Sequence, residues 1–195
     1  MSITNGYASL ADFKAFHSID STDATDDTVI ESAIEAASRH FDDQALRTFY
    51  ARTETRYFSV PVGRELRVDD DLLSITTLTN GDGDTIASSE YYLLPRNDTP
   101  KYAVVLKQAA TELWAPDTNG NTEYVISLLG SWGYASTRPD NVHWATLELA
   151  KAFYARRTGQ NMNMVARVTA AGVVMLPQGT PDWVADVIAG YRRRT

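Results

Sequence analysis

Three histidines and several acidic stretches are the parts of this sequence whose residue types suit catalysis or metal binding. The histidines are His17, His40 and His143, and none has a partner at the spacing of metal ligands or forms an H-E-x-x-H motif. The chain has no cysteine, which excludes disulfides and thiolate metal sites. We therefore predict no metal site and no cofactor.

One acidic stretch begins like a calcium-binding loop. Asn80, Asp82 and Asp84 alternate in the required way, but Thr85 and Tyr91 stand where such a loop needs glycine and a bidentate glutamate. The segment contains Asn-Gly and Asp-Gly, which supply the positive φ angles of tight turns. The stretch is therefore interpreted as a hairpin turn.

A second acidic stretch, residues 69–71, raises an enzymatic alternative. One of its three aspartates would work with Glu90 or Glu112 as an acid and base pair in a carboxylate-based hydrolase. The spacing favours this no more than a solvated loop, and the chain has no glycine-rich phosphate loop and no nucleophile elbow. We predict no catalytic residues and no enzyme, and keep the hydrolase as the alternative from a different class.

The composition is that of a folded protein with an acidic surface. Of the 195 residues, 44% are hydrophobic and 22% are charged, and the net charge is −7. This charge argues against a protein that grips the phosphates of nucleic acid, but it suits a channel wall that DNA passes without sticking. No apolar run is long enough to span a membrane, so no membrane partner is expected.

The elements that would position these residues follow one another in blocks. Residues 9–46 predict two helices, the first with Ser9 as its cap and Asp12 in a capping-box position. Residues 53–132 form a β-rich section with turn signals, which predicts a mostly antiparallel sheet of about five or six strands. A long central helix over 139–159 and an arm with a C-terminal helix over 160–195 follow.

These blocks predict a single domain over residues 1–195. Its fold class would be α+β and mainly helical, with packed helices into which the antiparallel β section is inserted. The long central helix and the C-terminal helix would form much of the helical part.

The central helix is apolar on two sides. One apolar stripe consists of Val142, Ala145, Leu149 and Phe153. The other consists of Trp144, Leu147 and Tyr154. Two stripes fit either a helix at the centre of one domain or a helix whose second side meets a neighbouring subunit. The second stripe is therefore our predicted subunit interface.

The passage from residue 132 to residue 157 holds the most specific pattern in the chain. It contains Trp132-Gly133-Tyr134, then Pro139, Val142 and Ala145, and then Ala152-Phe153-Tyr154-Ala155-Arg156-Arg157. In this pattern the chain resembles the head–tail connector, or adaptor, proteins of tailed bacteriophages. The order of the other parts is also similar, from two helices and an acidic linker at residues 10–41 to a last helix over 181–194.

The resemblance implies a structural virion protein that forms an oligomeric ring, commonly dodecameric, beneath the portal protein. The ring would extend the DNA channel and dock the tail or a head-completion protein, and DNA would pass without specific binding. The protein would be made in the bacterial host cytoplasm and lie in the virion neck. A tail-completion or terminator protein is the alternative within the same class.

The C-terminal helix is the predicted portal-docking element. Its candidate residues are Val184, Val187, Ile188, Tyr191, Arg192, Arg193 and Arg194. Three consecutive arginines on an acidic protein suit an acidic partner surface. They equally suit the negative end of the helix dipole, so both interpretations stay open.

Overall fold

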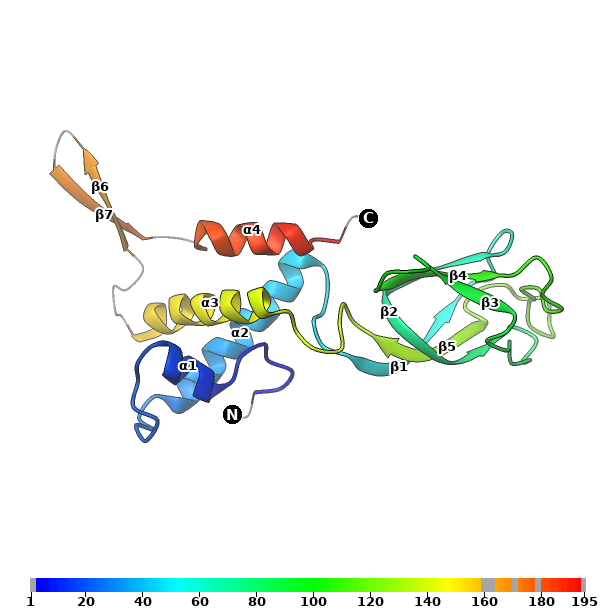
Figure 1. The fold of residues 1–195 in the computed structure, drawn as a ribbon, viewed down its shortest axis with the longest axis horizontal. Helices are drawn as coiled ribbons and strands as arrows, with labels where there is room; N and C mark the ends of the chain where they lie inside the picture. The colour runs from blue at the N-terminus through cyan, green and yellow to red at the C-terminus, as the bar shows by residue number, and fades with distance from the viewer. Residues whose placement is uncertain (1–2, 159–163, 170–171, 178–179, 194–195) are drawn as a thin grey trace. The chain divides into compact units, whose positions relative to one another are not determined.

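A computed structural model describes residues 3–158, 164–169, 172–177 and 180–193 of the chain. The chain divides into two compact units. We call residues 1–46 and 138–195 the helical unit, and residues 47–137 the sheet unit. Each is described by itself, and Figure 1 labels the elements of both. The single connector domain over 1–195 stays a prediction.

The helical unit is built from both ends of the chain. Its described helices are α1 (Leu10–Phe16), α2 (Asp27–Ala45), α3 (Asp140–Thr158) and α4 (Asp182–Tyr191). Two strands, β6 (Met164–Thr169) and β7 (Gly172–Pro177), pair antiparallel with each other in the segment where an arm was expected. The predicted central helix agrees with α3 to within one residue at each end.

Local sequence signals explain where the first two helices lie. The capping box of α1 is confirmed, because Ser9 Oγ accepts from the Asp12 N–H at 3.1 Å and the Asp12 carboxylate accepts from the Ser9 N–H at 3.0 Å. The amphipathic pattern of α2 buries Ile34 and Phe41 completely. These side chains form part of the core that α3 completes, and α2 and α3 lie side by side in Figure 1.

The sheet unit contains one five-stranded antiparallel sheet. Its strands are β1 (Arg52–Phe58), β2 (Glu65–Thr79), β3 (Tyr91–Leu94), β4 (Lys101–Leu106) and β5 (Ile126–Trp132). They lie in the order β1-β5-β2-β4-β3. The prediction of an antiparallel sheet in this section is confirmed.

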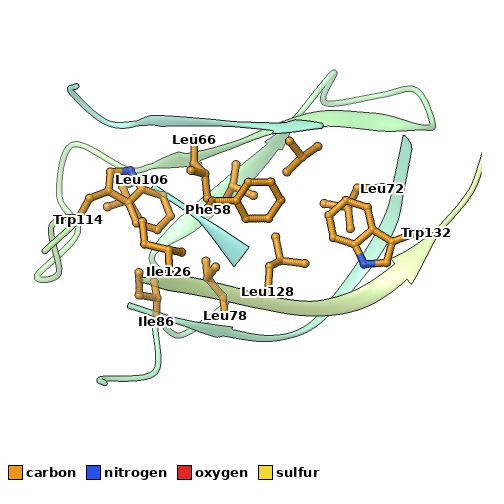
Figure 2. Close-up of a cluster of buried hydrophobic side chains, with 12 residues drawn as sticks. Phe58, Leu66, Leu72, Leu78, Ile86, Leu106, Trp114, Ile126, Leu128 and Trp132 are labelled. Carbon is orange, nitrogen blue, oxygen red and sulfur yellow. The ribbon is translucent and has the colours of Figure 1, made fainter. Parts of the chain in front are cut away.

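The sheet unit has a hydrophobic core of its own. Figure 2 shows side chains from its strands pointing into a shared interior, with Trp132 beside Leu72 at one end. Trp132 is fully buried, and its indole N–H donates to the backbone oxygen of Glu54 at 3.1 Å. The indole therefore satisfies its one polar group while it fills the core.

The prediction of a mainly helical fold is wrong. Helices and strands take up nearly equal shares of the described residues, and the strands form a compact unit with its own core. The acidic run 69–71 lies within a strand and is not a solvated loop, because β2 passes through it without a break and extends over 15 residues. β2 is stabilised along its length because it pairs first with β4 and then with β5. The local composition of the sequence does not specify this pairing.

The predicted hairpin after residue 80 is only partly present. A single bridge joins Thr79 to Thr85, and β3 begins later and pairs with β4 instead of β2. The turn itself is confirmed, since the Asn80 N–H donates to Asp84 O at 2.8 Å and the Gly83 N–H donates to Asn80 O at 3.1 Å.

Candidate interaction surfaces

The second apolar stripe of α3 divides between interior and surface. Leu147 is 1% exposed and Tyr154 is 9% exposed, whereas 49% of Trp144 is open to solvent. Tyr154 packs edge-on against Phe13 of α1, with ring centres 6.0 Å apart. The helical unit itself therefore covers most of Leu147 and Tyr154, and Trp144 alone of the three presents a large surface.

Trp144 belongs to a group of four rings at the end of α1 and in the first turns of α3. We call Phe16, His17, His143 and Trp144 the aromatic patch. The ring centres of Phe16 and Trp144 are 5.4 Å apart, those of Phe16 and His17 are 4.7 Å apart, and those of His143 and Trp144 are 5.3 Å apart. Phe16 is 38% exposed. The sequence analysis did not single out Phe16, although it stands three residues after the buried Phe13 on the same helix.

The two histidines of the patch lie in different surroundings. The Nδ1 atom of His143 lies 2.9 Å from the backbone oxygen of Tyr7, which makes this nitrogen the donor. Burial lowers the pKa of His17 from 6.5, and the nearby positive charge of Lys151 lowers it further. His17 is therefore mainly neutral at neutral pH, which keeps this part of the patch uncharged.

A cavity of about 230 Å³ lies next to the patch, between α1, α2 and α3. Its lining includes Phe13, His17, Asp26, Lys151 and Tyr154. The Tyr154 hydroxyl donates to Asp26 Oδ2 at 2.6 Å, and this bond, with burial and the nearby negative charges, raises the pKa of Tyr154 to about 12. The phenol is therefore protonated at neutral pH and is no base there.

Three of the carboxylates considered for a hydrolase, Asp69, Asp70 and Glu90, are engaged in other contacts. Asp70 pairs with Arg52 at 2.6 Å and with Arg56 at 2.8 Å, and Asp69 pairs with Arg56 at 2.7 Å. The Glu90 carboxylate accepts from the Thr111 N–H at 2.6 Å. Arg56 also lies over the Trp132 ring at 4.5 Å. The arginines and aspartates of β1 and β2 form an ion-pair network that supports the sheet, because several charges interact there at once.

The calcium-like stretch is likewise structural. Asn80 is 1% exposed; its amide donates to Leu113 O at 2.8 Å and accepts from the Ala115 N–H at 3.0 Å. In the part of the chain that the structure describes, no three His, Asp or Glu side chains are grouped so that they could hold a metal ion. None of the described helices is long and apolar enough to cross a membrane.

The candidate docking residues of α4 point in different directions. Val184 is fully buried and Ile188 is 8% exposed, so both face the helical unit. The Tyr191 hydroxyl donates to Asn141 Oδ1 at 2.8 Å, which fixes the end of α4 against the start of α3. Val187 is half-buried.

The two described arginines after α4 lie in different surroundings. Arg192 is exposed, while the Arg193 N–H donates to Ala45 O at 2.9 Å. Arg194 lies outside the described residues. Trp183, which the sequence analysis did not consider, is 43% exposed on α4.

Comparisons with known proteins identify the fold. One matching structure is a chain in the neck of an empty GTA particle, computed with C6 symmetry. Another is a chain in the virion of a native gene transfer agent (GTA) particle. Each match has a TM-score of 0.60 and 16% sequence identity, and covers 100% of this chain and 94% of the other.

The chain shares its fold with these particle proteins. At 16% identity the likeness extends to the fold alone. No protein-family model and no curated protein matches the sequence.

Proposed function

We propose that this protein is a structural subunit of the neck of a phage-like particle and acts there as a head–tail connector. The observation that carries the proposal is the match in fold, over the whole chain, to a chain from the neck of a GTA particle. The resemblance of residues 132–157 to connector proteins supports the same position. Neither line of support depends on a catalytic group.

The connector would work as a ring. That GTA neck was computed with C6 symmetry, which supports repeated copies around an axis for this chain also. We infer a dodecameric ring beneath the portal that extends the DNA channel and docks the tail or a head-completion protein. The net charge of −7 suits passage of DNA without specific binding. The protein would be made in the bacterial host cytoplasm and end in the virion neck.

The aromatic patch is the candidate subunit contact. Trp144 and Phe16 supply its exposed apolar area, and half-exposed aromatic side chains are enriched at the centres of interfaces. Leu147 and Tyr154 would contribute indirectly, because they are buried and hold α3 in place within the helical unit.

The C-terminal segment is the candidate portal contact. Val184, Val187, Ile188 and Tyr191 would fix α4 on the helical unit. Arg192, Arg193 and Arg194, which follow it in the sequence, would supply positive charge to an acidic surface of the portal.

The deciding experiment is the native mass of the purified protein, alone and mixed with its portal. A ring-sized species, or a monomer that the portal recruits into a ring, supports the connector. A monomer that ignores the portal contradicts it. Recruitment by the tail tube, with the symmetry of that tube, would instead identify a tail-completion or terminator protein.

Two variants test the contacts separately. Trp144→Glu places a charge in the aromatic patch and should abolish the ring, whereas Leu113→Glu, at a residue 57% exposed on the sheet unit, is the matched control. Removal of residues 192–195 should weaken portal binding at low salt and have less effect at high salt. Unchanged portal binding would mean that the arginines do not dock the portal and only complement the negative end of the helix dipole.

A further inference from the structure

The outer side of the sheet unit has a face without charged residues. We call it the uncharged face. Three strands contribute three residues each. They are Thr53, Thr55 and Tyr57 on β1, Ser127, Leu129 and Ser131 on β5, and Ser74, Thr77 and Thr79 on β2. All of these residues are Thr, Ser, Tyr or Leu.

The strand register brings these residues together. Thr55 and Thr77 both lie opposite Leu129, one on each side of β5, and directly paired residues share a face of a sheet. Thr55 is exposed, and Leu129 and Thr77 are half-buried. The centre of the face is thus one leucine between two threonines, with hydroxyl groups around it.

The rest of the same sheet is different. On β1, the charged residues Arg52, Glu54 and Arg56 occupy the alternate positions, and they form the ion-pair network on the opposite side. Where β2 pairs with β4, it carries Glu65 and the strongly exposed Arg67. The absence of charge is therefore a property of this face and not of the sheet as a whole.

We propose that the uncharged face is a contact surface for a second copy of this chain. Two copies that each carry a net charge of −7 repel one another, and a contact through a charge-free face brings no further like charges together. Loss of charged residues is also the compositional sign of the centre of a protein–protein interface. This inference rests on the proposed function, which places copies next to one another around an axis.

The proposed contact is made through the side chains on the uncharged face and not by adding a strand to the edge of the sheet. β1 is an edge strand, and its charged residues at alternate positions point toward the inner side, a feature that disfavours the addition of another strand. From strand spacing and rise, the face measures roughly 300 Å². A stable pair of proteins buries about 800 Å² on each partner, so this contact adds to others in a ring and forms only weak pairs in free solution.

The test uses the natural lack of cysteine, which makes a single introduced thiol unique. Ser74→Cys, at the margin of the face, is labelled with a thiol-reactive photo-crosslinker in the purified, concentrated protein. We expect a product of twice the chain mass. The matched control, Thr118→Cys in an exposed loop of the same unit, should give none. Adding Thr55→Asp to Ser74→Cys should remove the product while the unfolding curve stays unchanged.

Each result decides the proposal. The proposed contact is overturned by any of three results. These are the absence of a product from Ser74→Cys, equal amounts of product from Ser74→Cys and Thr118→Cys, and a product that persists after Thr55→Asp is added. In purified particles, a product that joins the chain to a different protein overturns the choice of partner. If the wild-type chain is missing from particles, the connector function fails, whereas the crosslink in purified protein still decides the uncharged face.

Discussion

The Tyr154 hydroxyl donates a hydrogen bond to Asp26 Oδ2 over 2.6 Å and thereby joins the last turns of α3 to the residue before α2. Asp26 is the N-cap of α2, but its side chain makes no capping bond to that helix. The carboxylate is used for the tertiary contact instead. A residue that the sequence analysis placed at a subunit interface thus ties together the two halves of the helical unit.

The first prediction concerns the strength of this bond. Tyr154→Phe removes the hydroxyl and leaves the Asp26 carboxylate without that donor, so the free energy of unfolding should fall by about 1–2 kcal/mol. Urea unfolding measures the change. Tyr57→Phe, at a residue 60% exposed, is the control and should change stability little. Equal stability of Tyr154→Phe and wild type would show that the bond contributes nothing.

The second prediction concerns high pH. The hydrogen bond to Asp26, followed by burial and the negative charges of Asp26 and Asp23, raises the pKa of Tyr154 from 10.0 to about 12. The folded protein therefore holds this proton more tightly than the unfolded chain does. The stability from Tyr154 is complete below pH 10.0 and is lost as the pH rises through about 12.

Unfolding midpoints across this range check the effect. Wild type should lose more stability than Tyr154→Phe between the two pKa values, so that their curves converge. Parallel curves up to the higher pKa would contradict the assigned cause of the shift.

The third prediction concerns Asn80. Its buried amide satisfies Leu113 O and the Ala115 N–H, and Asn80→Ala leaves both backbone groups without this partner. We expect a loss of about 2–4 kcal/mol in the free energy of unfolding. Asn119→Ala, in an exposed turn, is the matched control. Added calcium should not raise the melting temperature, because the stretch is a turn and not a calcium loop.

The fourth prediction concerns Gly133 in the Trp132-Gly133-Tyr134 passage. Its φ is +138°, and an added Cβ would overlap the backbone oxygen of Tyr50. Gly83 has a φ of +94° and open space around it, so Gly83→Ala reports backbone strain alone. Gly133→Ala should cost at least about 2 kcal/mol more than Gly83→Ala, since strain and overlap add. Thermal or urea unfolding of the two variants provides the comparison.

Local signals in the sequence determined the helices. Ser9 and Asp12 supply both halves of a capping box within four residues, and the apolar spacing of α2 requires one buried side. The incomplete calcium-loop pattern was also recognisable, because it depends on residue types at fixed spacing. In these cases the interacting groups lie close together in the sequence.

The tertiary structure alone decided which surfaces are open. The sequence shows two apolar sides on α3, but only the packing of α1 and α2 determines that Tyr154 is covered and Trp144 exposed. The uncharged face depends on the register that places Thr55 and Thr77 beside Leu129, although these residues are far apart in the chain. Such surfaces come from long-range pairing, whose partners a local pattern does not specify.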